Sequence, residues 1–258
     1  MTTVRNLKLV IQFDGTDFHG WQWQDNLRTV QGELFRGLQE LVGQPVTLHS
    51  SSRTDAGVHA LAMPVSFRLD TTLPCKAFVM GLNTKLPPDL RVLSCRDVPP
   101  DFNARFCATG KTYRYRVQTG PIPLPLLRRT AWHVPLPPSM DAMREAAAIL
   151  VGEHDFSAFR SVHCDARSPV RVLRRLEVLE EAPGVLAIEV EAGGFLRNMV
   201  RILAGTLVDV GGGRHPPSWV AELLQHGDRC KGAMTAPAKG LTLASVTYPP
   251  GSEDLPEP

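Results

Sequence analysis

The sequence predicts a mixed α/β protein of the α+β kind, built from two similar modules. Along its 258 residues, short stretches rich in β-branched and aromatic residues are interspersed with amphipathic stretches of helical period. Strict strand–helix alternation is missing, and a proline-rich stretch, residues 121–138, separates two halves of similar rhythm. We therefore expect an N-terminal module over residues 1–120, a connection over 121–138, a C-terminal module over 139–248 and a disordered tail over 249–258.

The N-terminal module is expected to begin with a strand, because residues 7–13 alternate between apolar and polar side chains. Thr29 is placed to cap a helix that extends through residue 41, on which Leu34 and Leu38 recur at helical spacing. The loop between them, residues 14–28, contains Gly15, Gly20 and Asn26, with Trp21 and Trp23 among polar residues. Further strands are expected at residues 46–51, 65–69 and 91–96, and a second helix at residues 76–82.

In the second half, residues 111–119 form the clearest strand, and the alternation places Tyr113 on its apolar face. Ser139 is placed to cap a helix that extends to residue 151. A long helix over residues 195–210 is expected to end at the glycines that begin with Gly211. The other expected elements are strands at residues 170–179, 185–191 and 241–248 and a short helix at 219–224.

Composition and charge narrow the class of protein. The formal net charge is +2 and the sequence pI is about 8.3, which permits a nucleic-acid partner without demanding one. The five cysteines, an odd number, argue against a disulfide framework. The sequence contains neither a C-x-x-C nor an H-x-x-x-H pair, so nothing in it resembles a structural zinc site. The first residues do not resemble a signal peptide, and no apolar run reaches the ~18 residues that cross a bilayer. We expect a soluble, cytoplasmic protein.

The most unusual segment is the loop 52–60, which places Arg53, Asp55 and His59 within a few residues of one another. Gly57 can adopt a positive φ and tighten a turn that fixes Asp55. If Arg53 lies within reach, it favours the ionised carboxylate, which is the form that a nucleophile needs. The alternative is a connecting turn in which Asp55 bonds only backbone amides, and the residues alone favour that alternative.

Three basic segments suit an RNA partner, because cations contact phosphates and aromatic rings stack on unpaired bases. Residues 105–116 carry four basic and no acidic side chains, interleaved with aromatic residues. Residues 160–175 carry six basic side chains against Asp165, and the helix 195–210 carries Arg201, which could pair with a carboxylate. The alternatives are solvated faces of a strand, a loop and a helix, with Tyr113 in the core.

Several motifs together carry a family resemblance. The segment Arg53-Thr54-Asp55-Ala56-Gly57-Val58-His59-Ala60 closely resembles the active-site motif of the TruA family of tRNA pseudouridine synthases. Other blocks follow in the family's order: Phe13-Asp14-Gly15-Thr16, Gly20-Trp21-Gln22, Asp101-Phe102-Asn103-Ala104-Arg105-Phe106, Lys111-Thr112-Tyr113-Arg114-Tyr115, Asp155-Phe156-Ser157-Ala158-Phe159, Met199-Val200-Arg201 and residues 240–248. The chain departs from the pattern at Ser52, at Met63-Pro64-Val65 and at Asn103, where Gly, Gln-Val and His are frequent.

The resemblance implies the pseudouridine synthase fold, with two α/β modules whose antiparallel sheets join and a central cleft between them. It implies that Asp55 is the nucleophile, that Arg53 helps to flip the target base, and that Arg201 holds the aspartate. Tyr113 would contact the flipped uridine. The residues implied to bind RNA are Arg53, Phe102, Asn103, Arg105, Phe106, His163, Cys164 and Arg167.

The implied activity is that of an isomerase that converts uridine to pseudouridine in tRNA, in the anticodon stem-loop at positions 38, 39 and 40. The reaction replaces a nitrogen–carbon bond by a carbon–carbon bond without redox change, and the resemblance implies neither a metal nor an organic cofactor. Family members act as homodimers, so tRNA and a second copy are the expected partners. Whether Asp55 attacks C1′ of the ribose or C6 of the base stays open.

Two other classes of protein compete with this prediction. A catalytically silent RNA-binding protein would keep the basic segments, but it would have no need of Asp55 in an intact motif. A carboxylate-dependent nucleoside hydrolase would need a second catalytic acid or a metal cluster, and the sequence offers no convincing candidate for either.

Overall fold

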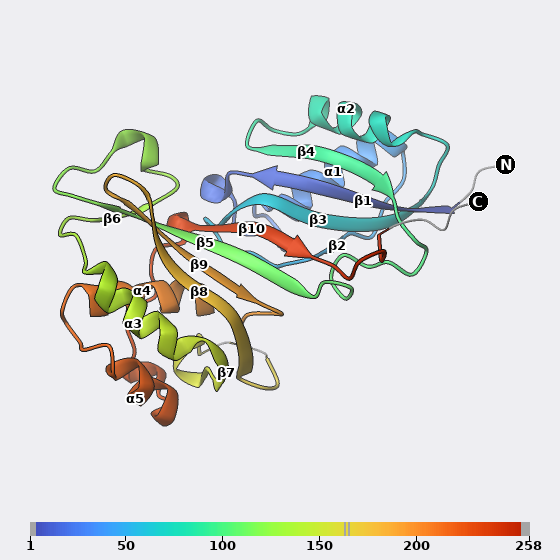
Figure 1. Ribbon diagram of the computed structural model, residues 1–258. Coiled ribbons are helices and arrows are strands. Elements are labelled where there is room, and N and C mark those ends of the chain that lie inside the picture. Colours follow the sequence, from blue (N-terminus) through green and yellow to red (C-terminus); the bar gives the residue numbers. More distant parts are fainter. Residues whose placement is uncertain (1–3, 163, 165, 254–258) are drawn as a thin grey trace. The chain divides into compact units, whose positions relative to one another are not determined.

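The protein is mixed α/β, as predicted, in a computed structural model that describes residues 4–162, 164 and 166–253 (Figure 1). The chain forms two compact units. The first comprises Met1–Thr109 and Leu243–Pro258, and the second comprises Gly110–Thr242. The units therefore divide next to Gly110, whereas the sequence predicts a connection at residues 121–138.

The first unit contains an antiparallel sheet with the strand order β4-β1-β3. The strands are β1 (Val4–Phe13), β3 (His59–Asp70) and β4 (Leu90–Asp97), and the short β2 (His49–Ser50) pairs with β3. Only these two residues of the predicted strand 46–51 are extended into a ladder. The last strand, β10 (Leu241–Thr247), continues into this unit, where it neighbours β3.

Two helices cover one face of this sheet, and their apolar sides form the core of the unit (Figure 1). They are α1 (Val30–Val42) and α2 (Cys75–Lys85). The predicted cap of α1 is confirmed, because the Thr29 hydroxyl accepts a hydrogen bond from the Gly32 N–H at 3.2 Å. Leu7, Leu9 and Ile11 of β1 and Leu34, Leu38, Phe78 and Leu82 of the helices are all fully buried.

The opposite face of this sheet is covered by the segment that follows β4. The Asn6 side-chain amide donates hydrogen bonds to the carbonyls of Pro99 and Phe102, at 2.7 and 2.8 Å. Phe102 packs with Val98, Ala104 and the partly buried Tyr248, whose hydroxyl donates to the Ala104 carbonyl at 2.8 Å. A segment from the middle of the chain and one near its C-terminus therefore close this face of the first unit together.

Lys8 lies beneath this cover and binds the C-terminal segment. Its ammonium group lies 5.2 Å from the centre of the Tyr248 ring and pairs with Glu253, which also pairs with Arg96. Burial, with a smaller contribution from the Arg96 charge, lowers the pKa of Lys8 to about 8. The residues just after β10 thus form a turn and an ion pair up to Glu253, and residues 254–258 of the predicted tail lie outside the described residues.

The second unit contains the strand order β5-β9-β8-β7, paired antiparallel throughout, with β6 added parallel to β5. The strands are β5 (Gly110–Thr119), β6 (Trp132–Val134), β7 (Gly152–Asp155), β8 (Val170–Ala182) and β9 (Val185–Ala192). Three helices gather on one side of β8 and β9 (Figure 1). They are α3 (Met140–Leu150), α4 (Met199–Gly211) and α5 (Trp219–His226).

Two predictions about the helices of this unit have different outcomes. The Ser139 cap of α3 is confirmed, since its hydroxyl accepts from the Ala142 N–H at 3.4 Å. The predicted start of the long helix is wrong, because α4 begins at Met199 and not near residue 195. Asn198 has a φ of 62°, in the left-handed region, which ends any right-handed helix that precedes it.

Five short 3₁₀ helices complete the secondary structure. They are η1 (Gly15–Asp17), η2 (Pro125–Leu127), η3 (Ser157–Phe159), η4 (Arg229–Lys231) and η5 (Ala238–Gly240). Within the described ranges, none of the helices has the length and apolar character needed to cross a membrane.

An ion pair joins the start of β1 to the end of β4 and makes the free energy of unfolding depend on pH. The Arg5 guanidinium donates two hydrogen bonds to the Asp97 carboxylate, at 2.6 and 2.7 Å, and holds the pKa of Asp97 below its ordinary range. The unfolded chain therefore binds more protons as the pH falls through about 4. The stabilisation is fully present above that pH and is lost below it.

We expect Asp97→Asn to lower the free energy of unfolding by about 1 kcal/mol at pH 7, since the pair is partly exposed. The difference between variant and wild type should shrink when the pH is lowered from 7 to 3, as measured by urea unfolding at both pH values. The control is Asp101→Asn, which changes an exposed carboxylate of the same unit. A deficit of the Asp97→Asn variant that persists unchanged at pH 3 would contradict the prediction.

Candidate functional site

The loop that carries Asp55 is held by backbone hydrogen bonds to the loop after β1. The Trp21 N–H donates to the Thr54 carbonyl at 3.0 Å, and the Gly57 N–H donates to the Phe18 carbonyl at 3.2 Å. Within the loop, the Val58 N–H donates to the Asp55 carbonyl at 3.2 Å, and Gly57 has the positive φ, 78°, expected for the turn. The carboxylate is thus carried by a turn that a second loop braces from outside.

Two glycines allow these loops to approach backbone to backbone. A Cβ atom on Gly15 would lie 1.9 Å from the Val58 carbonyl oxygen, and one on Gly20 would lie 2.6 Å from the Thr54 carbonyl oxygen. Gly20 also has a φ of 87°, which side-chain-bearing residues rarely adopt. Any side chain at either position would push the bracing loop away from Asp55.

His59 supports this arrangement from inside the unit. Its side chain is buried, and its Nδ1 atom accepts a hydrogen bond from the Gly15 N–H at 3.0 Å. The Asp14 carboxylate lies 3.2 Å from the same nitrogen. Because a buried backbone N–H needs an acceptor, we assign Nδ1 as the acceptor of the Gly15 N–H. Of the two alternatives for His59, turn support and proton transfer, the geometry favours turn support.

The side chains of the motif differ in exposure. Arg53 is exposed and Asp55 is half-buried, so the carboxylate lies at the edge of solvent with a cation two residues away. The neighbouring hydroxyls of Ser52 and Thr54 are buried and have no hydrogen-bond partner among the described residues. Ser52, which stands where the family pattern often has Gly, is therefore accommodated inside the loop and not at its surface.

The segment 102–106 presents one cation and one aromatic ring to solvent. Arg105 is exposed, Phe106 is 74% exposed, and the guanidinium carbon lies 5.2 Å from the centre of the Phe106 ring. The Asn103 side chain accepts hydrogen bonds from both backbone N–H groups, at 2.9 and 3.3 Å, and so shapes the turn that carries them. Phe102 is only 4% exposed, so its ring lies in the core of the first unit, and the expected contact of Phe102 with RNA stays a prediction.

In the second unit, Arg201 of α4 is held by its neighbours. Its Nε donates to the Ala236 carbonyl at 2.8 Å, and its Nη1 donates to the Asn198 side-chain oxygen at 3.1 Å. Tyr113 of β5 is 7% exposed, and its ring meets that of Phe195 edge-on, with 5.3 Å between the centres. Burial fits the core placement that alternation along the strand predicts for Tyr113.

The loop after β7 contains the other expected RNA contacts. Arg167 is exposed and Cys164 is half-buried, with the Arg197 N–H 3.5 Å from the Cys164 sulfur. The Ser161 N–H donates to the Arg197 carbonyl at 3.1 Å, which anchors the loop next to the start of α4. His163 lies outside the described residues.

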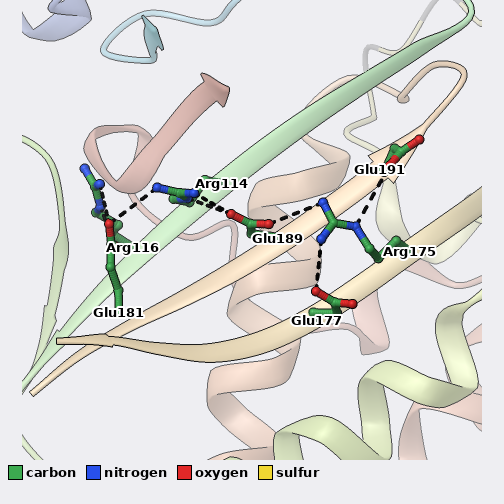
Figure 2. A network of polar contacts seen from close by, with 7 residues as sticks. All are labelled: Arg114, Arg116, Arg175, Glu177, Glu181, Glu189 and Glu191. Carbon is green, nitrogen blue, oxygen red and sulfur yellow. Dashed lines mark hydrogen bonds and ion pairs between the residues drawn. The ribbon is translucent and has the colours of Figure 1, made fainter. Parts of the chain in front are cut away.

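The basic face of β5 is neutralised by glutamates of the neighbouring strands (Figure 2). Arg116 binds Glu181 at 2.6 Å, and Arg114 binds Glu189, its cross-strand neighbour, at 2.6 Å. Arg116 holds the pKa of Glu181 below its ordinary range, because the hydrogen-bonded carboxylate is favoured in its charged form.

The network continues across β9 to β8, where Glu189 also lies 3.3 Å from Arg175 (Figure 2). Arg175 in turn approaches Glu177 and Glu191. Counting basic residues along a single segment missed these acidic partners, because they come from other strands. The alternation of Glu189 and Glu191 with apolar residues on β9 was the available signal.

The described residues contain no group of three or more His, Cys, Asp or Glu side chains placed to hold a metal ion. The first unit offers instead a braced carboxylate with an exposed cation two residues away in sequence and, in the turn 103–106, a cation beside an aromatic ring that suits RNA.

Comparison with known proteins identifies the class to which this site belongs. The sequence model of a family described as tRNA pseudouridine synthase matches residues 9–107 and 146–249. The chain belongs to this family. It is therefore an enzyme of the isomerase class, and the reaction of the family converts uridine to pseudouridine in tRNA.

The relatives confirm the resemblance to the TruA family. A tRNA pseudouridine synthase A from Myxococcus xanthus is 47% identical over 245 residues, which cover 95% of this chain and 92% of that protein. Another from Geobacter sp. (strain M21) is 45% identical over 247 residues, 95% of this chain and 100% of that protein. A crystal structure of the archaeal box H/ACA Nop10–Cbf5 complex aligns with 79% of this chain and 43% of that one, at 13% identity and a TM-score of 0.36, a similarity that supports no conclusion here.

The close approach of the two loops predicts the effect of a side chain at Gly20. We expect Gly20→Ala to lower the free energy of unfolding by about 2–4 kcal/mol, since roughly 1 comes from the positive φ and roughly 1–3 from the overlap with Thr54. The control is Gly43→Ala, which has a φ of 72° and no atom within 4 Å of the added Cβ, so it should cost about 1 kcal/mol. Equal losses for the two variants in urea unfolding would show that the loops do not constrain each other.

The network on β5, β8 and β9 predicts that Glu189 contributes more to the free energy of unfolding than Glu177 does. Glu189→Gln removes a largely buried charge shared by Arg114 and Arg175, and we expect a loss of about 1–3 kcal/mol in the free energy of unfolding. Glu177→Gln changes an exposed partner of Arg175 and should cost less than about 0.5 kcal/mol. Thermal and urea unfolding of both variants would test the ranking, and the reverse order would refute it.

Proposed function

We propose that Asp55 is the catalytic nucleophile with which this enzyme converts uridine to pseudouridine in tRNA. The observation that carries the proposal is the braced turn that holds a half-buried carboxylate within an intact R-T-D-A-G-V-H motif. A carboxylate nucleophile needs a fixed position close to the atom that it attacks. The bonds from the loop 14–28 supply that fixed position.

The reaction is an isomerisation in which atoms and electrons balance without a co-reactant. The bond between N1 of uracil and C1′ of ribose breaks, and a bond between C5 and C1′ forms. The proton on C5 is lost, and N1 gains one. A covalent adduct of the carboxylate divides this step into two easier ones, whether Asp55 attacks C1′ or C6.

Arg53 is proposed to assist base flipping. A uridine in a stacked helix cannot reach a carboxylate at the protein surface unless it leaves the stack. Arg53 is exposed and lies two residues from Asp55, so its guanidinium is suited to occupy the space that the base leaves.

Tyr113 and Arg201 are assigned to the same reaction on the strength of the family motif. Tyr113 is proposed to contact the flipped uridine, and Arg201 to hold Asp55 in place. The bonds from Arg201 to Ala236 and Asn198 support a fixed guanidinium, which is what such a role needs.

RNA is proposed to contact the exposed Arg105 and Phe106, with Asn103 shaping their turn, and the loop of His163, Cys164 and Arg167. A cation and an aromatic ring side by side suit a phosphate and an unpaired base. By the same family resemblance, we propose that the target uridines lie at positions 38, 39 and 40 of the anticodon stem-loop. We also propose that the enzyme acts as a cytoplasmic homodimer.

Replacement of the nucleophile tests the central proposal. We expect Asp55→Asn to abolish pseudouridine formation while tRNA binding survives, because the change keeps size but removes the negative charge. Pseudouridines are mapped in treated tRNA by carbodiimide-blocked reverse transcription, with Asp101→Asn as the control.

Three outcomes distinguish the alternatives. Turnover near the wild-type rate by folded Asp55→Asn protein would remove Asp55 from the mechanism. Binding of tRNA by wild type without any pseudouridine would indicate a silent RNA-binding protein, and release of free uracil would indicate a hydrolase.

A comparison of the exposed Arg105 with Arg116, which is paired with Glu181, tests the proposed RNA surface. We expect Arg105→Ala to weaken tRNA binding and to reduce the slope of log affinity against log salt by about 1, as the loss of one phosphate contact should. Arg116→Ala should leave that slope unchanged, since Glu181 already neutralises its charge. Filter binding at several salt concentrations provides the slopes, and identical slopes for Arg105→Ala and wild type would contradict the assignment.

A further inference from the structure

A cavity of about 500 Å³ opens in the first unit where the loop after β1 meets α1. It is lined by residues 23–24 and 26–29 of the loop and by Gly32, Glu33 and Arg36 of the helix. Its volume lies within the range of sites that bind small molecules or single nucleotides. Neither the Asp55 motif nor the proposed RNA contacts account for it.

Trp23 forms one wall of this cavity and is exposed, yet it is held in one orientation. The residue is 45% exposed, whereas Trp21 and Trp219 are 3% and 9% exposed. Its indole N–H donates to Asp25 at 3.3 Å, and its backbone N–H donates to the Gln31 side chain at 2.9 Å. An exposed large aromatic ring that is fixed in advance loses little entropy when a flat ligand stacks on it.

The α1 helix fixes the ring from below. The Phe35 ring meets the indole at 84°, with 5.6 Å between centres. A Cβ atom on Gly32 would lie in ordinary van der Waals contact with two carbons of the indole, at 3.5 and 3.6 Å, so the ring lies against this part of the helix. The indole is thus packed on the helix side and open toward the cavity.

The polar groups of the cavity suit the rest of a nucleotide. The charged lining residues are Arg28, Arg36 and Glu33, and Asp89 pairs with Arg28 from outside the lining. Arg28 is fixed by a bidentate pair with Asp89, at 2.8 Å for both bonds, whereas the Arg36 side chain is 52% exposed and its guanidinium contacts Glu33 at 2.8 Å. Arg36 is therefore the cation best placed for a phosphate, and the amide groups of Gln24 and Asn26 can bond base edges.

The cavity adjoins the loop that braces Asp55. Trp21 bonds to Thr54, and Trp23 follows two residues later, a chain distance of at most about 7 Å. An RNA strand whose target uridine reaches Asp55 would therefore pass close to Trp23. Both positions belong to the first unit, so this proximity depends only on contacts within it.

We propose that the Trp23 cavity binds an unpaired nucleotide that neighbours the target uridine in the RNA substrate. The base stacks on the indole of Trp23, and the phosphate binds Arg36. The identity of the RNA rests on the proposed function, but the binding of an unpaired nucleotide can be measured without catalysis.

The experiment measures binding of a tRNA transcript to protein that carries Asp55→Asn, so that no turnover occurs. In this background, Trp23→Ala should weaken binding roughly five- to hundredfold, the range found for loss of one stacked base. Trp23→Phe should restore most of the affinity, because a phenyl ring also stacks. Arg36→Ala should weaken binding by less than Trp23→Ala does, because Glu33 already offsets part of the Arg36 charge. The control is Met80→Ala, which removes an exposed apolar side chain of α2 outside the cavity.

Fluorescence gives a second measurement, which reports on the Trp23 ring itself and not on affinity. Stacking should quench the emission of Trp23 and protect it from acrylamide when RNA binds, and the Trp23→Phe variant should lose this change. Binding and protection that are the same in Trp23→Ala, Met80→Ala and the parent protein would overturn the inference. If wild type forms no pseudouridine but binding still depends on Trp23, the proposed reaction fails and the nucleotide site stands. If pseudouridine forms and Trp23→Ala binds like Met80→Ala, the site fails and the reaction stands.

Discussion

The contact between the loop 14–28 and the loop 52–60 is the constraint on which the candidate site depends. It is made backbone to backbone, through the bonds of Trp21 to Thr54 and of Gly57 to Phe18, and Gly15 and Gly20 make the approach sterically possible. A carboxylate on an unsupported turn would sample many positions, and a nucleophile that is displaced by about 1 Å loses much of its rate advantage. The buried His59 adds a bond from the inside, so the turn is fixed on two sides.

The same loop gives the proposed nucleotide cavity its position. Its first part braces Asp55, and its second part places Trp23 over α1. One short segment would therefore set both the position of the nucleophile and the path of the RNA next to it. One segment can fix both positions because a loop held by backbone hydrogen bonds has little conformational freedom, so the residues between those bonds keep their orientation.

Many basic side chains of this protein are paired with acidic ones, so the number of basic residues in a segment does not give the charge of its surface. The arginines of β5 and β8 are matched by glutamates of β8 and β9, so a strand that is basic in sequence forms a nearly neutral face in the fold (Figure 2). Lys8 shows the same principle at a buried position, where the C-terminal Glu253 supplies the counter-charge between aromatic rings. Arg105 differs from these paired residues because it is exposed beside the Phe106 ring. Together the two side chains form a surface that suits a phosphate and a base.

Local patterns in the sequence determined the α/β class, the caps at Thr29 and Ser139, the turn at Gly57 and the family motif around Asp55, because each depends on residues within one or two turns of chain. Only the tertiary structure decided that Phe102 is buried while Phe106 is exposed, that α4 begins at Met199, and that Arg114 is neutralised. The hydrogen bond from Arg114 to Glu189 joins residues 75 positions apart, and the ion pair of Lys8 and Glu253 joins residues 245 apart. A single strand shows which of its faces is polar, but the neighbours that neutralise or cover that face are chosen by strand pairing, which local periodicity does not encode.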